Sequence, residues 1–230
     1  MKSILSKLIE FDSSLRKDFS NHYFIGIDEV GRGALAGPVI ACAFAWKKDI
    51  NEVQVRYKIS LKKLNDSKQL NKRQRQEIYN SLIKLGNFSL GYASVQEIDK
   101  LNILNATFLA MKRAFENLVL VINEKKLEPY VLIDGNKFNP YINSRQSSVI
   151  GGDAKSSLIA SASIIAKVYR DMLMEKVSKL KRYKRFGWHK NVGYGTLFHR
   201  TAIKNHGITA LHRKLFVRKI TASVLTTVKD

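Results

Sequence analysis

Residues 23–46, which read YFIGIDEVGRGALAGPVIACAFAW, decide the fold. The apolar run Tyr23–Ile27 predicts a buried strand that ends at Asp28, and Val39–Trp46 predicts a second strand of similar character. Three glycines indicate that a tight connection joins the two runs: Gly31, Gly33 and Gly37. Two neighbouring strands joined in this way predict a hairpin at the centre of a sheet.

The rest of the chain interleaves further helices and strands. Helical patterns cover residues 1–20, about 72–85, about 98–123, about 153–180 and 201–227, and strand patterns cover residues 88–94 and 128–133. A break between Leu101 and Ile103 is expected in the third of these helices. The fourth carries a core-facing stripe made of Leu158, Ala162, Ile165, Tyr169 and Met172 or Leu173. This order predicts an α/β or α+β domain with a mixed central sheet.

Positive charge dominates the composition. The 230 residues include 40 Lys plus Arg against 19 Asp plus Glu, a formal net charge of +21, and 45% of them are hydrophobic. That apolar fraction suffices for a core, so we expect one globular domain rather than a disordered polycation. A charge this high is typical of proteins that bind a polyanion. Nucleic acid is the leading candidate, with an anionic membrane surface as the alternative.

Membrane insertion, secretion and disulfide bonding are not predicted. The longest apolar stretch, residues 34–46, is interrupted by Gly37 and Pro38 and is shorter than the ~20 residues that a spanning helix needs. The N-terminal segment contains Glu10 and Asp12 where a secretory signal has a long uncharged core. The single cysteine, Cys42, excludes an internal disulfide and a multi-cysteine zinc site. A reducing, cytoplasmic setting is therefore the default expectation.

Acidic residues are scarce in this chain, and their positions are informative. Asp28 and Glu29 follow the first predicted strand, and Asp134 follows a second apolar strand within LIDGN. We expect adjacent strand ends to bring these three carboxylates close together. Crowded carboxylates repel one another, and hard divalent ions such as Mg²⁺ are the natural partners of such a group. Asp171 is a fourth candidate, at the border between the apolar stripe and the polar side of its helix.

Each of these acids also has an ordinary structural role open to it. A strand-end aspartate can cap a turn or a helix, and Asp171 beside Arg170 can be a solvated surface charge. Taken together, a basic surface that holds phosphates and an acidic pocket that binds metal indicate a phosphodiester nuclease. A non-catalytic nucleic-acid binder is the competing class. Such a binder has no need for acids at two strand ends beside a glycine turn.

Seven blocks of sequence, in order along the chain, resemble ribonuclease HII, the type 2 ribonuclease H. The first is IGIDEVGRGALAGPV at residues 25–39. The others are LNDSKQL (64–70), EIDKLNILNATFLAMKRA (97–114), LIDGN (132–136), GDAKSSLIASASIIAKVYRD (152–171), GYGT (193–196) and HGITALHRKLF (206–216). The resemblance therefore spans nearly the whole chain after residue 22.

The resemblance implies a ribonuclease H-like fold, with a mixed five-stranded sheet flanked by helices and a helical C-terminal portion. It also implies endonucleolytic cleavage, dependent on Mg²⁺ or Mn²⁺, of the RNA strand of RNA–DNA hybrids and at single ribonucleotides embedded in duplex DNA, leaving 5′-phosphate and 3′-hydroxyl ends. The four family carboxylates, which are the catalytic metal ligands, match Asp28, Glu29, Asp134 and Asp171.

The family's recognition of the ribose 2′-hydroxyl matches two places in this chain. Gly31, Arg32 and Gly33 match a turn that senses the hydroxyl through backbone groups, and glycine there permits close approach to the sugar. Tyr194 matches the tyrosine that stacks beside the junction deoxyribose. Without the family, an ordinary tight turn and a core aromatic are the favoured explanations of these residues.

Contacts to the phosphate backbone are expected from two further segments. Asn65, Ser67 and Lys68 form a loop-plus-lysine arrangement suited to one phosphate, with capping of the following helix as an alternative role. Lys155 and Arg170, on the long helix, are expected to face the substrate, whereas Lys167 on the same helix is more typical of a solvated charge. The basic and aromatic stretch of residues 181–190 is expected to follow the duplex, its aromatics serving chiefly as packing anchors.

We expect a single catalytic domain over residues 1–230, with residues 1–22 as an N-terminal extension and about 181–230 as the helical part that completes the substrate cleft. That extension is too short for the extra N-terminal domain of type 3 enzymes. A monomer is expected, and the C-terminal TASVLTTVKD contains no clear motif for binding a sliding clamp. The chain departs from the family pattern near Ile208, Ala210 and Leu215, which concerns the shape of that loop rather than the chemistry.

Overall fold

The computed structural model describes residues 3–48, Leu64 and residues 70–226. Two compact units divide the chain. The first comprises Met1–Val30, Ile40–Tyr92 and Phe108–Val168, and the second comprises Gly31–Val39, Ala93–Thr107 and Tyr169–Asp230. We describe each unit by itself. The expectation of a single catalytic domain over residues 1–230 stays a prediction.

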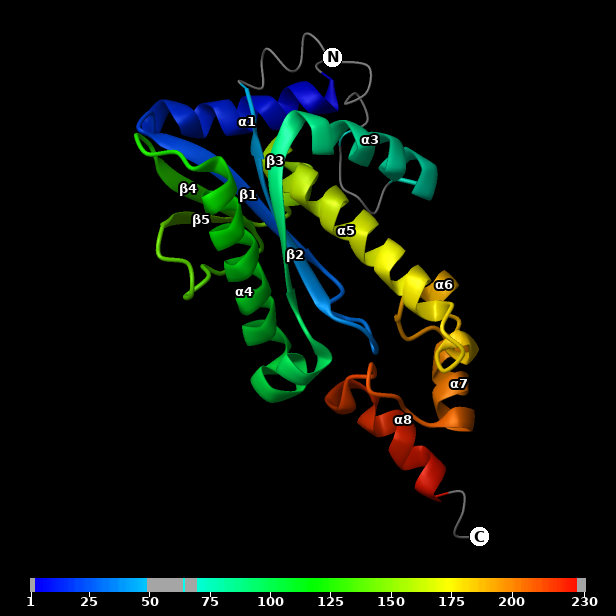
Figure 1. The fold of residues 1–230 in the computed structure, drawn as a ribbon. Coiled ribbons are helices and arrows are strands. Elements are labelled where there is room, and N and C mark those ends of the chain that lie inside the picture. The colour runs from blue at the N-terminus through cyan, green and yellow to red at the C-terminus, as the bar shows by residue number, and fades with distance from the viewer. Residues whose placement is uncertain (1–2, 49–63, 65–69, 227–230) are drawn as a thin grey trace. The chain divides into compact units, whose positions relative to one another are not determined.

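A five-stranded mixed sheet lies at the centre of the fold, in the order β3-β2-β1-β4-β5 (Figure 1). The strands are β1 (His22–Val30), β2 (Val39–Trp46), β3 (Gly86–Ala93), β4 (Glu128–Asp134) and β5 (Arg145–Val149). β1 is antiparallel to β2 and parallel to β4, and β4 is parallel to β5. The expected mixed five-stranded sheet is therefore confirmed, as is the hairpin formed by its first two strands.

β1 extends two residues beyond the predicted end. Asp28 pairs with Cys42, and the next two residues continue the ladder with β2 as Glu29↔Ala41 and Val30↔Ile40. The expectation that the strand ends at Asp28 was wrong, because ladder hydrogen bonds use the backbone and tolerate acidic side chains. Asp28 and Glu29 therefore have their directions set by the pleat of a strand rather than by a turn.

Most helices fall close to the expected ranges, but the helical pattern over 201–227 was only partly right, because it is broken into two helices after Gly207, whose φ is +70°. The helices are α1 (Ile4–Asp18), α3 (Lys72–Leu85), α4 (Val95–Ile122), α5 (Ser157–Ser178), α6 (Trp188–Asn191), α7 (Leu197–His206) and α8 (Lys214–Thr226), with 3-10 turns at Gly152–Ala154 and Lys184–Phe186. α3 begins at a capping box in which Asn71 and Gln74 exchange hydrogen bonds. α4 is interrupted at Asn102, whose φ is 68°, where a break was predicted. None of the helices in the described ranges combines the length and hydropathy needed to cross a bilayer.

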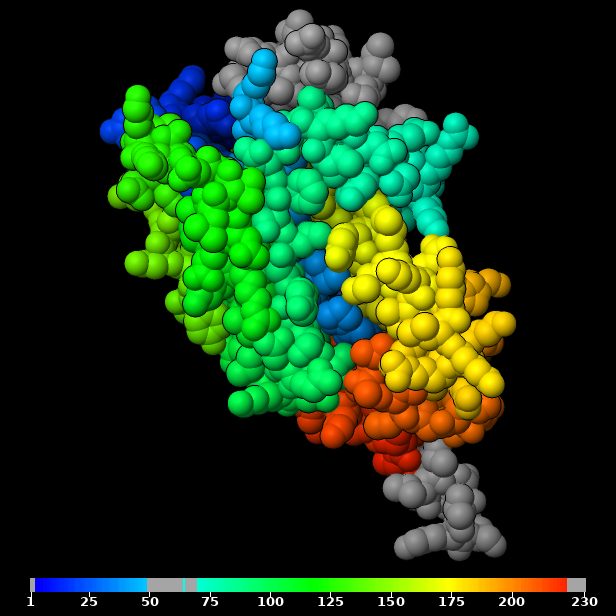
Figure 2. Space-filling view, viewed as in Figure 1, coloured from blue at the N-terminus to red at the C-terminus, as the bar shows by residue number. Residues whose placement is uncertain are grey.

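Helix α4 packs directly against the sheet at β3. A Cβ atom on Gly91 would lie 2.1 Å from the carbonyl oxygen of Ala110 and 2.5 Å from the amide nitrogen of Ala114, so only glycine permits this approach. Figure 2 shows residues 108–122 of α4, in green, beside the teal surface of β3. This contact fixes the position of α4 against β3 in the first unit.

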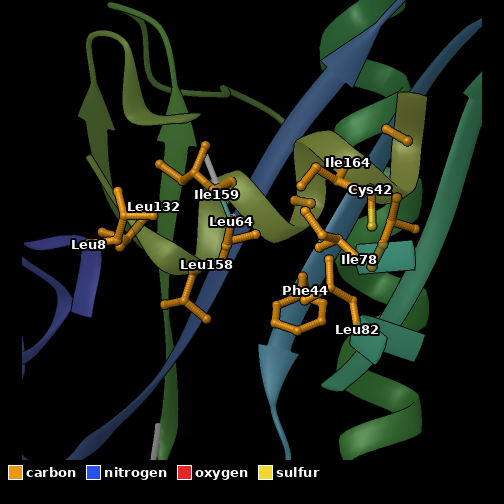
Figure 3. Packing of buried hydrophobic residues seen from close by; sticks show 14 of the residues in the cluster. Leu8, Cys42, Phe44, Leu64, Ile78, Leu82, Leu132, Leu158, Ile159 and Ile164 are labelled. Carbon is orange, nitrogen blue, oxygen red and sulfur yellow. The ribbon is translucent and has the colours of Figure 1, made fainter. Parts of the chain in front are cut away.

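Helix α5 is the central helix of the first unit, and its N-terminal half is buried on all sides. A Cβ atom on Gly26 of β1 would lie 2.4 Å from the carbonyl carbon of Leu158, so the two backbones are in direct contact. Figure 3 shows Leu158 and Ile159 packed in the same cluster as Leu8 of α1 and Leu132 of β4. Contact this close positions the next turns of α5 against β1.

The predicted stripe along α5 is only partly correct. Leu158, Ala162 and Ile165 are buried, but Tyr169 is 43% exposed and Met172 is 54% exposed. The pattern fails because the first half of the helix is enclosed on every face, whereas the second half, which belongs to the second unit, buries Met174 in place of the predicted positions.

The N-terminus of α5 is capped by a residue far away in the sequence. Asp12 of α1 is 1% exposed, and its Oδ2 accepts hydrogen bonds from the Ser157 amide (2.9 Å), the Ser157 hydroxyl (2.5 Å) and the Leu158 amide (3.3 Å). Its Oδ1 has no hydrogen-bond partner among the described residues. Burial raises the pKa of Asp12 to about 6, against the opposing effect of these hydrogen bonds. The cap thus ties α1 to α5 through a carboxylate that loses its hydration.

The second unit has a core of its own built on aromatic side chains. Tyr183, Phe186 and Trp188 are buried, and the rings of Tyr183 and Phe186 stack on Trp188 at centroid distances of 5.0 and 5.5 Å. The prediction that the aromatics of residues 181–190 serve as packing anchors is confirmed. The lysines and arginines between them are exposed, as at Lys184 and Arg185.

Substitutions of Asp12 should distinguish the stability that comes from its hydrogen bonds to α5 from the effect of its negative charge. The raised pKa means that the neutral form is favoured in the folded state, a stabilisation that is complete below about pH 4 and is lost as the pH rises through about 6. Asp12→Asn keeps an acceptor oxygen without the charge. Its unfolding free energy relative to the wild type should therefore increase between pH 4.5 and pH 7.5, by up to roughly 3 kcal/mol. Urea unfolding at both pH values measures this difference.

Asp12→Ala is the control for the cap, because it loses the acceptor as well as the charge and should lower stability relative to Asp12→Asn by about 1 kcal/mol at either pH. A difference between Asp12→Asn and the wild type that does not change with pH would contradict the assignment.

Candidate active site

Three acidic side chains lie at neighbouring positions on the two central parallel strands of the first unit. Ile27 of β1 pairs with Ile133 of β4. The residues that follow them, Asp28 and Asp134, therefore occupy equivalent positions on the two parallel strands. Glu29 follows on β1. The structure thus places three of the four predicted acids at neighbouring backbone positions of the sheet.

Asp28 is the most strongly perturbed of these acids. It is 6% exposed, and burial raises its pKa well above the usual value, with the negative charges of Glu29 and Asp134 raising it further. Two hydrogen bonds oppose this shift: one from the Ser163 hydroxyl of α5, and one from the Glu29 amide to Asp28 Oδ1 at 2.7 Å. Two hydrogen-bond donors therefore orient Asp28, while burial and the neighbouring acids disfavour its charged form.

Asp134 is oriented by the loop that precedes α5. Its Oδ1 accepts a hydrogen bond from the amide of Gly152 at 2.7 Å, at the start of the 3-10 turn before α5. A Cβ atom on Gly152 would lie 3.3 Å from that oxygen and 2.5 Å from the side chain of Ile159. Glycine at this position therefore lets the turn approach the strand end and fix one carboxylate oxygen.

The donor chemistry of Asp28, Glu29 and Asp134 fits a divalent cation. All three offer hard carboxylate oxygens, and their mutual repulsion is relieved when a cation lies among them. As the side chains stand, no three His, Cys, Asp or Glu residues within residues 3–48, Leu64 and 70–226 converge on a single ion position.

The fourth predicted acid, Asp171, lies in the second unit. It is half-buried on α5, next to Arg170. Burial lowers the pKa of Arg170, and the nearby Tyr194 and Asp171 only partly oppose this shift. The membership of Asp171 in a four-carboxylate site stays a prediction.

Arg170 does not have the exposed position expected of a phosphate contact. Its side chain is 0% exposed, and all three guanidinium nitrogens donate to backbone carbonyls. The acceptors are Pro38 O (3.1 Å), Ala36 O (3.0 Å) and Val192 O (2.9 Å). We correct the predicted role accordingly, because donors committed to buried carbonyls are not available to a phosphate. Arg170 holds the glycine-rich turn in place.

The glycine turn is held by a second buried arginine that sequence reasoning missed. Arg213 is 0% exposed; its Nε and Nη2 donate to Gly37 O at 3.0 and 2.9 Å, and its Nη1 donates to Arg32 O at 2.9 Å. Nothing distinguishes this arginine from the many surface cations of so basic a chain. The turn between β1 and β2 is thus fixed through its carbonyls.

Gly31, Arg32 and Gly33 differ in how tightly the turn constrains them. Gly31 is buried and has φ +91°, and a Cβ atom there would lie 2.3 Å from Arg170 Nε. Arg32 and Gly33 are exposed, and a Cβ atom on Gly33 would meet nothing within 4 Å. The first glycine is therefore required by the packing, whereas the second leaves the surface of the turn open.

Tyr194 lies over the same arginine. Its side chain is half-buried, and the Arg170 Cζ lies 5.5 Å from the centroid of its ring. Its carbonyl oxygen accepts a hydrogen bond from His199 Nδ1 at 2.9 Å. The ring and the glycine turn thus share one buried support within the second unit.

Behind Tyr194, two buried histidines form a network that sequence reasoning also missed. His199 Nδ1 donates to a carbonyl, so its Nε2 accepts from Trp188 Nε1 (3.0 Å) and from His212 Nε2 (3.2 Å). The Thr209 amide donates to His212 Nδ1 at 2.9 Å. Burial, and then the neighbouring histidine, lowers the pKa of His212 to about 4, so the network is uncharged at neutral pH.

The remaining predicted phosphate contacts divide into lysines that the structure describes and residues that it does not. Lys155 is exposed on the turn before α5 and Lys167 is half-buried on α5. Asn65, Ser67 and Lys68 lie outside the described residues.

Comparison with known proteins identifies the family. The family model for ribonuclease HII matches residues 25–219. A ribonuclease HII of Fusobacterium nucleatum is 48% identical over 198 residues, covering 85% of this chain and 86% of that protein. The chain belongs to the ribonuclease HII family. A further ribonuclease HII, from Wolbachia pipientis, is 44% identical over 205 residues and covers 89% of this chain and 95% of that protein.

Solved structures agree with the ribonuclease HII fold. The ribonuclease H2 of Pyrococcus horikoshii matches with a TM-score of 0.62 at 24% identity, over 88% of this chain and 98% of that one. A Bst-RNase HIII crystallised with Mn²⁺ matches with a TM-score of 0.68 at 21% identity, over 91% and 71% of the two chains. The ribonuclease HII in a PCNA complex from Archaeoglobus fulgidus matches with a TM-score of 0.63 at 22% identity, over 83% and 93%. These likenesses confirm the ribonuclease H-like fold.

As a ribonuclease HII, the chain is an endoribonuclease that hydrolyses RNA in RNA–DNA hybrids and depends on divalent metal ions. Of the departures from the family pattern, Ile208 is 42% exposed and Leu215 is 50% exposed. Between them, the amide of Thr209 reaches His212, so this loop is closed by a hydrogen bond.

Gly31→Ala and Gly33→Ala should differ strongly in stability. Alanine at position 31 must adopt φ +91° and clashes with the Arg170 side chain, so we expect a loss of at least 2 kcal/mol in unfolding free energy. Alanine at position 33 meets open space and should change stability by less than about 0.5 kcal/mol. Thermal or denaturant unfolding of the two variants provides the comparison, and equal stability would contradict the assigned support of the turn.

Proposed function

We propose that this ribonuclease HII, besides cleaving RNA in RNA–DNA hybrids, cuts at single ribonucleotides embedded in duplex DNA and leaves 5′-phosphate and 3′-hydroxyl ends. The supporting observation is the burial of Asp28 beside two other acids, Glu29 and Asp134. A carboxylate kept close to like charges is costly to the fold. A cation-binding role accounts for that cost, whereas a simple nucleic-acid binder has no need of it.

Asp28, Glu29, Asp134 and Asp171 are the proposed ligands of catalytic Mg²⁺ or Mn²⁺. Such ions, when bound in pairs, activate water and stabilise the leaving oxygen of a phosphodiester. The chain's own part is orientation: the Ser163 hydroxyl and the Glu29 amide direct Asp28, and the Gly152 amide directs Asp134. Oxygens held in this way need little rearrangement to receive a cation.

The proposed contacts to the ribose come from the turn of Gly31, Arg32 and Gly33 and from the ring of Tyr194. The buried guanidinium groups of Arg170 and Arg213 support this proposal, because they fix the turn from behind and leave its outer side exposed. A rigid turn without side chains at both glycines can approach a 2′-hydroxyl closely. Arg170 thus serves the proposed site as a positioning residue.

The excess of positive charge supports binding to the phosphate backbone. Exposed Lys155 is the proposed contact from the first unit, and the exposed cations of residues 181–190 are those of the second. Asn65, Ser67 and Lys68 remain proposed phosphate contacts from the sequence pattern alone. We further propose a monomeric, cytoplasmic enzyme whose affinity for hybrids falls steeply with salt concentration.

Asp28→Asn and Asp134→Asn should each abolish cleavage while leaving hybrid binding largely intact. Each change removes a proposed cation ligand but keeps the size of the side chain, so we expect a loss of about 10³-fold or more in turnover. Cleavage of a hybrid with Mg²⁺ and with Mn²⁺, alongside binding measured in EDTA, provides the readout. Glu77→Gln, an exposed acid on α3, is the control. Near-normal turnover in either aspartate variant would overturn the assignment.

Tyr194→Ala should reduce cleavage at a lone ribonucleotide in duplex DNA by about 10- to 100-fold, the worth of one ring stacked on a nucleotide. The all-RNA strand of a hybrid should be affected less, since no RNA-to-DNA junction is read there. Parallel assays on the two substrates measure the ratio. Tyr92→Ala, which removes a 62% exposed tyrosine, is the matched control. Equal activity on the single-ribonucleotide duplex would mean that Tyr194 only packs.

A further inference from the structure

A cavity of about 320 Å³ lies in the first unit, at the end of β1 opposite the acidic residues. His22 lines it, and six residues of extended strand separate His22 from Asp28, which corresponds to about 20 Å. Its volume is at the lower end of the range of small-ligand sites in proteins, about 300–1,000 Å³. The cavity is therefore distinct from the candidate active site, and nothing in the proposed function uses it.

Cationic side chains predominate in its lining. The lining includes three cationic residues, Arg16 of α1 and the consecutive Lys47 and Lys48 after β2, and a single acidic residue, Glu124. Glu124 is engaged with its own loop, where its carboxylate accepts a hydrogen bond from the Lys126 amide at 2.7 Å. This excess of positive charge favours an anionic ligand.

Aromatic side chains supply the apolar part of the lining. Trp46 is half-buried, and its indole Nε1 donates to Ser157 Oγ at 3.1 Å, so the polar edge of that ring is already occupied within the protein. Tyr23 and Phe24 of β1 line the same space. Flat apolar walls beside cations suit a ligand that joins an aromatic ring to a charged group.

One polar atom of the lining lacks a partner. Nδ1 of His22 is buried and has no hydrogen-bond partner among the described residues. The His22 ring packs edge-on against Phe19 and Tyr130 at centroid distances of 5.9 and 5.8 Å, and those two rings are themselves 4.5 Å apart. Buried polar atoms are nearly always satisfied in proteins.

We propose that this cavity binds a phosphorylated nucleotide unit, with the phosphate on Lys47 and Lys48 and the base against Trp46. Two sources offer that chemistry: a free nucleoside monophosphate and the 5′-phosphorylated end of a nucleic-acid strand. The proposal does not rest on the proposed cleavage reaction, because the cavity and the acidic residues share no side chain.

Fluorescence of Trp46 provides a direct test. The chain has two tryptophans, and the other, Trp188, is fully buried in the second unit. Titration of the full chain in EDTA with AMP should quench the emission with millimolar affinity or better, and adenosine and inorganic phosphate should each bind at least tenfold more weakly. Trp46→Phe, which keeps an aromatic wall, should lose the fluorescence change while calorimetry still detects AMP.

Matched variants separate the cavity from general charge. Lys48→Glu should weaken AMP binding at least tenfold, whereas Lys181→Glu, an equal change of charge at an exposed lysine of the second unit, should leave it within twofold. If a 5′-phosphorylated trinucleotide binds and responds to Lys48→Glu while AMP does not bind, the source is a strand end.

The proposal would be overturned if neither AMP nor the phosphorylated trinucleotide binds at concentrations up to about 5 mM. A dissociation constant of that size corresponds to a binding free energy of roughly −3 kcal/mol. Equal effects of Lys48→Glu and Lys181→Glu, or inorganic phosphate binding as tightly as AMP, would also overturn the proposal. None of these results depends on cleavage, so a failure here leaves the proposed function standing.

Discussion

Three acidic residues at neighbouring positions on β1 and β4, one of them buried, are the constraint on which the rest of the first unit depends. Asp28 and Asp134 occupy equivalent positions on parallel strands, and burial together with the charges of Glu29 and Asp134 raises the pKa of Asp28. Such a group is unfavourable by itself, so the surrounding core must hold it. The direct contact of α5 with Gly26 does so, and it brings the Ser163 hydroxyl to Asp28. Stability is given up at the position where we propose that the fold binds cations.

In the second unit, the main constraint is a glycine-rich turn that is held in one conformation. Glycine is the residue with the most conformational freedom, so the turn acquires its shape from the outside. Two buried arginines hold that shape by donating hydrogen bonds to backbone carbonyls. Arg170 donates to Ala36, Pro38 and Val192. Arg213 donates to Arg32 and Gly37. Two buried cations thus define the backbone proposed to read the ribose, and the exposed cations are left for phosphates.

Local patterns predicted much of the fold, and long-range contacts explain what they missed. The strand Val39–Trp46 and the helix Lys72–Leu85 were predicted at their observed bounds, because a continuous apolar run and helix-stop residues are properties of neighbouring residues. The strand Arg145–Val149 was not found by pattern, since RQSSV has one apolar residue and is stabilised by pairing with β4. The acids stood out because they are rare in a basic chain. Arg213 did not, because its burial is a property of the folded unit.

The central claim is that Asp28 is held in repulsive surroundings that a divalent cation relieves. The most direct measurement is the melting temperature of the wild type and of Asp28→Asn, each in EDTA and in Mg²⁺. The account predicts that Asp28→Asn melts higher than the wild type in EDTA, and that Mg²⁺ raises the melting temperature of the wild type but not that of the variant. A variant that melts lower in EDTA and gains as much from Mg²⁺ as the wild type would contradict it.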